Sequence, residues 1–138
     1  MSQVFFTDRD LGKRFPDLLR GAGFEVERHA DHFAPDCPDT DWLREVGARG
    51  WAAITHDRQI RYKPNERAAV MAHGVALLVV IGAVPYPQLA ASFIATRGRI
   101  LKFIAEHAPP YIAKVYRPTP AELAKNPDAA GRVERWFP

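Results

Sequence analysis

The sequence has little cysteine and no long apolar run, and each absence excludes a class of protein. Cys37 is the only cysteine among the 138 residues, so the chain is not an internally disulfide-linked scaffold, and one cysteine fits a reducing compartment. A transmembrane helix needs about 20 largely apolar residues, and the sequence contains no such segment. The first residues lead straight into the strand-like run 4–7, without the basic and long apolar regions of a secretory signal. We therefore expect a cytoplasmic protein with no membrane partner.

Neither sign of charge dominates the composition. There are 19 Lys and Arg residues against 16 Asp and Glu residues, which gives a net charge of +3 and a pI of about 9.2. This balance suits an ordinary solvated surface and leans only slightly towards anionic partners. The apolar content of 47% is sufficient for a buried core, and the length is typical of a single domain.

Short β-like runs alternate with helical patterns along the chain. Strands are predicted at 4–7, 24–29, 51–55, 75–81 and 111–116, and helices at 11–22, 41–49, 64–73 and 87–107. This alternation predicts an α/β fold with one parallel sheet of about five strands, flanked by helices on both faces. We expect residues 1–117 to form this single domain. Residues 118–138 contain four prolines and are expected to form a C-terminal tail with one helical turn, packed on the domain or binding a partner.

Aspartates occur where the predicted parallel strands end. Asp8 directly follows the first strand and Asp57 the third, while Asp39 and Asp41 lie at the start of the helix after the second. Functional groups in such sheets gather beyond the carboxyl ends of the strands, so these carboxylates are expected to converge. Several converging carboxylates need a compensating cation, and Mg²⁺ and Mn²⁺ prefer oxygen ligands. The pattern therefore predicts a divalent-metal site that can activate water for attack on a phosphate.

Each aspartate also has a purely structural interpretation. Asp8 and Asp39 can cap helices, and Asp41 in a first helical turn suits the helix dipole. Asp57 can begin a turn. It is the joint placement of these residues at strand ends that favours a functional site.

Three blocks of sequence, in the same order, resemble PIN-like toxin domains. The first is the run at 5–12, where an aspartate follows the first strand, and the others are 38–43 and 51–61. The similarity is closest to the short VapC-like branch, which has a Thr-His/Lys-Asp motif and a basic Arg-x-x-Pro-x-Glu segment, here residues 61–66. The resemblance covers roughly residues 4–81.

The resemblance implies a PIN-like fold and Mg²⁺- or Mn²⁺-dependent cleavage of RNA. It also implies a ribonuclease toxin of a type II toxin–antitoxin pair, inhibited by a cognate antitoxin protein, and by analogy a homodimer. It places Asp8, Asp39 and Asp57 at the catalytic site as metal ligands, with Asp41 as a fourth member or a substitute for Asp39.

Two neighbours of Asp57 are weaker candidates for the site. Thr55 can hydrogen-bond a carboxylate or a substrate phosphate, although its place in a strand also explains a β-branched residue. His56 has a pKa range suited to acid–base chemistry, but we expect it to face solvent. Larger PIN nucleases often have a further acid after the fourth strand, and residues 75–86 contain none. Whether one or two metals bind is left open.

Two groups of basic residues flank the predicted acidic site. They follow the first and the third strand: Arg9, Lys13 and Arg14, then Arg58, Arg61, Lys63 and Arg67. Both groups are expected to rim one crevice, where phosphate contacts would give sequence-independent affinity for RNA. Tyr62 among them can stack on an unpaired base. For any single arginine, a solvated surface is the alternative.

Two other functions are compatible with the sequence. A phosphoacceptor receiver domain, a signalling module, also has acids after the first strand (Asp8 and Asp10) and an aspartate after the third. Its lysine near the fifth strand would be Lys114. Against it, the end of the fourth strand at 79–83 lacks the hydroxyl residue that this module needs, and no proline follows Lys114. A catalytically inactive PIN-like binding module is the second alternative.

Overall fold

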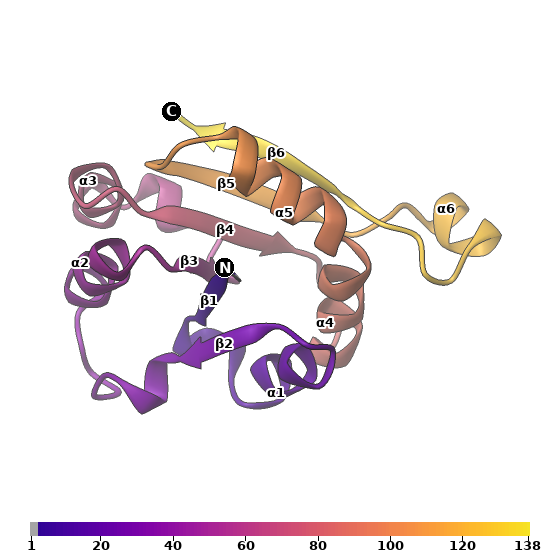
Figure 1. Cartoon of the computed structure of the whole chain (residues 1–138), viewed down its shortest axis with the longest axis horizontal. Coiled ribbons are helices and arrows are strands. Elements are labelled where there is room, and N and C mark those ends of the chain that lie inside the picture. Colours follow the sequence, from indigo (N-terminus) through magenta and orange to yellow (C-terminus); the bar gives the residue numbers. More distant parts are fainter. Residues whose placement is uncertain (1–2) are drawn as a thin grey trace.

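The computed structural model describes residues 3–138 and contains one mostly parallel sheet (Figure 1). Its six strands lie in the order β2-β1-β3-β4-β5-β6, and β6 alone runs antiparallel to its neighbour. The strands are β1 (Val4–Thr7), β2 (Glu25–Arg28), β3 (Ala52–Thr55), β4 (Ala76–Ile81), β5 (Tyr111–Tyr116) and β6 (Arg132–Phe137). The predicted α/β fold with a parallel sheet is confirmed.

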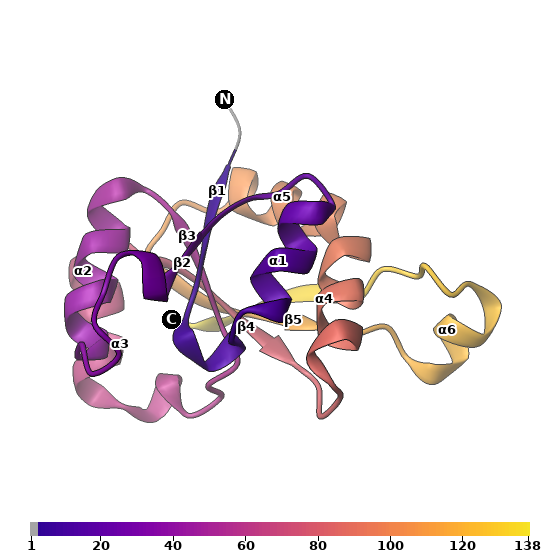
Figure 2. The ribbon, with the colours of Figure 1, turned by 90° about the horizontal axis from the view of Figure 1, so that it is seen from below.

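Helices cover both faces of the sheet (Figures 1 and 2). They are α1 (Arg14–Gly21), α2 (Asp39–Arg49), α3 (Pro64–Ala72), α4 (Tyr86–Ala95), α5 (Arg97–Glu106) and α6 (Pro120–Lys125), with short 3₁₀ turns η1 (Arg9–Leu11), η2 (His29–Asp31) and η3 (Ile60–Tyr62). Helices α1, α4 and α5 pack on one face, and α2 and α3 pack on the other. None of the helices within residues 3–138 combines the length and the apolar character needed to cross a bilayer.

Successive residues of the central strands are apolar because the sheet is buried on both sides. In β1, Phe5 points into the core formed with α1, α4 and α5, and Phe6 points into the core formed with α2 and α3. Both side chains are almost fully buried, at 2% and 0% exposure. Alternate residues of a strand face opposite sides of a sheet, so two covered faces remove the polar positions that a half-exposed strand would show.

The segment predicted as one long helix, 87–107, is two helices. The break is at Thr96, whose buried Oγ1 donates to the Ser92 carbonyl (2.6 Å) and accepts from the Gly131 backbone N–H (3.0 Å). The apolar periodicity hides this break because Phe93 and Ile100, on either side of it, belong to the same core. The first predicted helix, 11–22, is shorter in the structure, because α1 begins at Arg14 and Leu11 is instead the last residue of η1.

The last residues contribute a sixth strand that the sequence pattern did not predict. After Thr119 and Glu122 form a capping box at α6, the chain returns along the sheet and β6 pairs with β5. Trp136 and Phe137 pack against the core on the α2 and α3 face. The strand lacks a clear apolar alternation because three of its six residues are exposed and none is fully buried, so its pairing depends on the free edge of β5.

Gly131, where the chain turns from α6 into β6, offers a test of this arrangement. A Cβ at this position would lie 1.7 Å from the Tyr116 carbonyl oxygen, so Gly131→Ala must displace the backbone. We expect a loss of about 1–3 kcal/mol or more in the free energy of unfolding, measured by urea denaturation. In the control Gly98→Ala, an added Cβ in α5 meets nothing within 4 Å, and better helix propensity should stabilise the protein by up to about 1 kcal/mol. Equal stabilities for the two variants would contradict the close approach at Gly131.

Candidate metal centre

A depression of about 330 Å³ at the carboxyl edge of the sheet gathers four aspartates and two cations. Its lining residues are Asp8, Asp10, Asp39, Asp57, Arg9 and Lys63. The three aspartates predicted from the sequence therefore lie around one hollow, and Asp10 joins them. The strand register explains the convergence, because β1 and β3 are neighbours and Thr7 pairs with Ile54.

Asp8 is held at the end of β1 by hydrogen bonds to both carboxylate oxygens. Its Oδ1 accepts from the Arg9 backbone N–H (2.7 Å), and its Oδ2 accepts from the Thr55 hydroxyl (2.9 Å). The residue is 6% exposed. Asp8 thus caps η1, as the structural interpretation of the sequence allowed, and it also lines the depression.

Asp10 is the site residue that the nuclease interpretation of the sequence did not assign. The η1 turn folds it back, so that its Oδ2 accepts from the His56 backbone N–H (3.1 Å) and lies 3.2 Å from the Thr55 hydroxyl. Its Oδ1 is buried and has no hydrogen-bond partner among residues 3–138. The sequence hinted at Asp10 only by its position two residues after Asp8. The tight η1 turn is what brings the two carboxylates together.

Thr55 connects the aspartates that follow β1 and β3. Its fully buried hydroxyl lies within hydrogen-bonding distance of Asp8 and of Asp10, and it accepts from the Asp57 backbone N–H (3.2 Å). A hydroxyl has one proton, so it donates to one of the two carboxylates at a time. Strand propensity alone would explain a threonine at position 55, but its hydroxyl also orients the carboxylates of the site.

The other two aspartates are held by side chains of their own segments. Asp39, the first residue of α2, accepts from the Trp42 indole N–H (2.9 Å), and Trp42 is fully buried. Asp57 accepts from the Gln59 backbone N–H (2.9 Å) and from the Lys63 ammonium (2.6 Å). The turn that Asp57 was expected to begin is therefore present as well.

The carboxylates of the depression carry more negative charge than their surroundings compensate. Burial and, to a smaller extent, the adjacent Asp10 carboxylate raise the pKa of Asp8 to about 7. Burial also raises the pKa of Asp10. On the far side of the site, the hydrogen bond to Asp57 raises the pKa of the Lys63 ammonium. Lys63 is thus paired with Asp57, whereas no cationic side chain within residues 3–138 forms a salt bridge with Asp8 or Asp10.

Some residues predicted for the site lie elsewhere. Asp41 is exposed on α2 and does not line the depression, so it does not replace Asp39. His56 is not solvent-facing as expected: it is half-buried, and its Nε2 lies 3.0 Å from the Gly82 carbonyl oxygen. Its ring also contacts Tyr86 edge to face.

The basic residues do not rim one crevice as predicted. Only Arg9 and Lys63 line the acidic depression. Lys13 lines an adjoining cavity of about 150 Å³, which Arg9 shares. Arg61 turns towards the C-terminal strand, where its Nε donates to the Trp136 carbonyl (3.2 Å). The remaining predicted RNA contacts, Arg14 and Arg58, are exposed and line neither space.

The residues of the depression fit a hard divalent cation in their chemistry. The four aspartates offer carboxylate oxygens as metal ligands, the type of ligand that Mg²⁺ and Mn²⁺ prefer. The unpartnered Oδ1 of Asp10 and the raised pKa of Asp8 mark a place where positive charge would be favourable. Within residues 3–138, however, no three His, Cys, Asp or Glu side chains are already arranged to hold one metal ion. Binding therefore requires side-chain adjustment, most simply of Asp57 away from Lys63.

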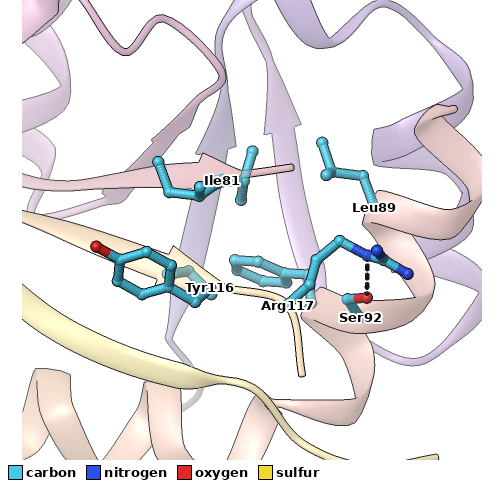
Figure 3. A pocket seen from close by; sticks show the side chains of 8 residues that line it. Ile81, Leu89, Ser92, Tyr116 and Arg117 are labelled. Atoms are coloured by element: carbon cyan, nitrogen blue, oxygen red, sulfur yellow. Dashed lines mark hydrogen bonds between the residues drawn. The ribbon is translucent and has the colours of Figure 1, made fainter. Parts of the chain in front are cut away.

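Two other cavities lack comparable chemistry. Between the ends of β4 and β5 and helix α4, Arg117 donates to Ser92 Oγ (3.1 Å) beside a cavity of about 10 Å³ (Figure 3). This is room for about one water molecule. A groove of about 700 Å³ at the opposite edge of the sheet is lined largely by apolar side chains such as Phe5, Phe24 and Leu101.

The raised pKa of Asp8 predicts how the metal-free protein responds to pH. A carboxyl with a pKa of 3.8 when unfolded and about 7 when folded stabilises the fold fully below pH 3.8, and this contribution is lost as the pH rises through 7. In EDTA, Asp8→Asn should therefore be more stable than the parent protein near pH 8, by about 2–4 kcal/mol in chemical denaturation. The advantage should shrink towards about pH 4. Asp41→Asn, at an exposed position, should change stability by less than about 0.5 kcal/mol throughout; matching pH profiles for both variants would refute the burial effect.

Comparison with known families matches the part of the chain that contains the acidic depression. A family model described as a PIN-like domain matches residues 3–82, which are 80 of the 138 residues and include all four aspartates. No curated protein and no solved structure matches the chain. The matched part runs from β1 to the end of β4, so it contains the whole depression but not α4 to β6. The chain belongs to the family of PIN-like domains, which are generally nucleases.

Proposed function

We propose that this protein is an endoribonuclease that depends on Mg²⁺ or Mn²⁺. The observation that carries the proposal is the gathering of four aspartates in one depression of a PIN-like fold. Buried carboxylates that lack a compensating cation are costly, and such clusters are typical of functional sites.

Asp8, Asp10 and Asp57 are the proposed metal ligands, positioned from the ends of β1 and β3. Thr55 fixes the orientation of Asp8 through its hydroxyl. Asp39, restrained by the Trp42 indole, serves as a further ligand or orients the attacking water. When bound, the cation would lower the pKa of a water molecule and stabilise the negative charge that develops on the attacked phosphate.

Arg9 and Lys63 are the cations placed to meet the RNA backbone at this site. Both line the depression with the aspartates. Release of Lys63 from Asp57 would free an ammonium for a phosphate oxygen in the same step that frees the carboxylate for the metal. Lys13, in the cavity that Arg9 shares, extends the basic surface on the β2 side.

The proposal extends to a biological role as the toxin of a toxin–antitoxin pair. Its support is the similarity of the sequence blocks, including the basic segment 61–66, to the VapC-like branch. In this role a cognate antitoxin protein inhibits the nuclease, which acts as a homodimer.

The receiver-domain alternative is disfavoured by the position of its lysine. Lys114 would have to reach the acidic site from β5, but its Nζ lies 4.1 Å from the centre of a Trp136 ring. The cation that contacts Asp57 is Lys63 instead. An inactive binding module would show RNA binding without cleavage, so the assay below separates it from the nuclease.

Cleavage of RNA by the purified protein tests the proposal. With a mixed RNA pool, we expect cleavage in Mn²⁺ or Mg²⁺ and none in EDTA. Asp8→Ala, Asp10→Asn and Asp57→Ala should each lower the rate by at least about 100-fold, because each removes a donor from the cation that carries the chemistry. The measurement is the initial rate on denaturing gels.

Asp41→Ala is the matched control for these substitutions. It removes an exposed carboxylate from the same helix as Asp39 but from outside the depression, so its rate should stay within about twofold of the parent rate. Metal-independent cleavage, or an equal loss in all four variants, would refute the proposed centre. Labelling of Asp57 by acetyl phosphate without cleavage would favour the receiver domain.

Binding of the cation should stabilise the folded protein in a pH-dependent way. At a Mn²⁺ concentration 100 times Kd, mass action gives about 2.7 kcal/mol of stabilisation. The Mn²⁺-induced rise in Tm should be larger near pH 8 than near pH 5.5, because protons compete for an Asp8 carboxyl with a pKa of about 7. Asp8→Asn should lose most of this rise and Asp41→Asn should keep it. An undiminished rise in Asp8→Asn would place the bound ion elsewhere.

A further inference from the structure

A surface of aromatic and basic side chains lies beside the acidic depression, on the face of the sheet that α2 and α3 cover. We call it the C-terminal platform and define it as Arg61, Tyr62, Lys114 and Trp136. Its members come from η3, β5 and β6, and the last two lie beyond the segment 3–82 that the family model matches. The end of β6 lies on the same side of the molecule as α3 (Figure 1).

The platform holds an exposed aromatic ring in a defined orientation. Tyr62 is 59% exposed, which is unusual for a large aromatic residue, and its ring meets Trp136 edge to face at 5.8 Å between centroids. The Arg61 guanidinium lies 5.4 Å from the Tyr62 ring centre and 5.5 Å from that of Trp136. Because Arg61 also donates to the Trp136 carbonyl (3.2 Å), it connects η3 to β6 and holds the two rings together.

The charge of the platform is positive and is not neutralised locally. Within residues 3–138, no carboxylate forms a salt bridge with Arg61, Arg67 or Lys114. Glu134 pairs with Lys114 in the β5–β6 register, but its carboxylate binds Arg132 instead (2.6 Å). Arg67 adds to the positive charge at the border, with its guanidinium 5.0 Å from the Phe137 ring.

The platform is continuous with the proposed catalytic site. Lys63, next to Tyr62 in the chain, contacts Asp57 at 2.6 Å. In the sheet, Lys114 pairs with Val79, which pairs with the site residue Thr55. The backbone of Lys114 in β5 is therefore two strand spacings, or about 10 Å, from that of Thr55 in β3. The platform therefore lies close to the aspartates, both along the chain through Lys63 and across the sheet.

We infer that the C-terminal platform binds single-stranded RNA, with an unpaired base stacked on Tyr62 and backbone phosphates near Arg61 and Lys114. This inference rests on the proposed function, since it names how the RNA of that site is held. Exposed aromatic rings bordered by cations bind single strands because every base offers a stacking face and every linkage a negative charge. In a duplex the bases are already stacked on each other, so the Tyr62 ring has no equivalent partner there.

Binding of a short, fluorescein-labelled single-stranded RNA by the full-length protein in EDTA tests the inference. Fluorescence anisotropy without divalent ions separates binding from cleavage. Tyr62→Ala should raise Kd by at least about fivefold, the effect of losing one stacked base, whereas Tyr62→Phe keeps the ring and should stay within about twofold. Lys114→Ala should weaken binding and lower its salt dependence. Lys102→Ala removes an equal charge from α5 on the opposite face and should do neither.

The outcomes distinguish failure of this inference from failure of the proposed function. Binding that depends on Tyr62 without metal-dependent cleavage supports the platform and refutes the nuclease. Cleavage with unchanged Kd in Tyr62→Ala refutes the platform and leaves the nuclease. An equal loss of affinity for duplex RNA in Tyr62→Ala would also refute base stacking. Unchanged RNA affinity together with self-association that depends on Tyr62, measured by sedimentation, would assign the surface to a second copy of the chain and overturn the inference.

Discussion

The parallel pairing of β1 with β3 is the constraint on which the acidic depression depends. With Thr7 opposite Ile54, the next residues along the two strands are Asp8 and Thr55, whose hydrogen bond of 2.9 Å joins the strand ends. A shift of one residue would turn these side chains to the other face of the sheet. Both strands are buried on both faces, so the two hydrophobic cores hold this register for the polar groups at its end.

The η1 turn then brings a second carboxylate, that of Asp10, back to the strand end that Asp8 occupies. Asp8 and Asp10 share one hydroxyl donor, and burial raises the pKa of each. The rest of the fold sustains this unfavourable arrangement because the adjoining strands and helices bury large side chains such as Phe6 and Trp42. Local destabilisation at a functional site, supported by a well-packed body, is a common pattern in proteins. A divalent cation would convert that local cost into binding affinity.

The C-terminal part of the chain changes what the PIN-like part presents to its surroundings. Segment 3–82 contains the acidic depression, but two residues of its η3 turn, Arg61 and Tyr62, contact Trp136, which follows β5 in the chain. Strand β6 covers the edge of β5 and brings Trp136 to Arg61 and Tyr62. Without that strand, Arg61 would lose its carbonyl acceptor and the aromatic contact would disappear. The core fold supplies the acidic depression, and the added strand supplies the contacts that hold Arg61 and Tyr62 next to Trp136.

The sequence by itself determined the class of fold and pointed to Asp8 and Asp57 after two strands and to Asp39 at the start of a helix, because apolar periodicity and strand direction are local properties of the chain. Only the tertiary structure brought Asp10 into the depression and left Asp41 outside it, since a two-residue spacing has no fixed direction until η1 has formed. It also decided that Arg61 faces Trp136, 75 positions away, and that β6 forms a strand at all. These contacts depend on the edge of β5 and on burial between distant segments, and no local pattern of residues encodes either.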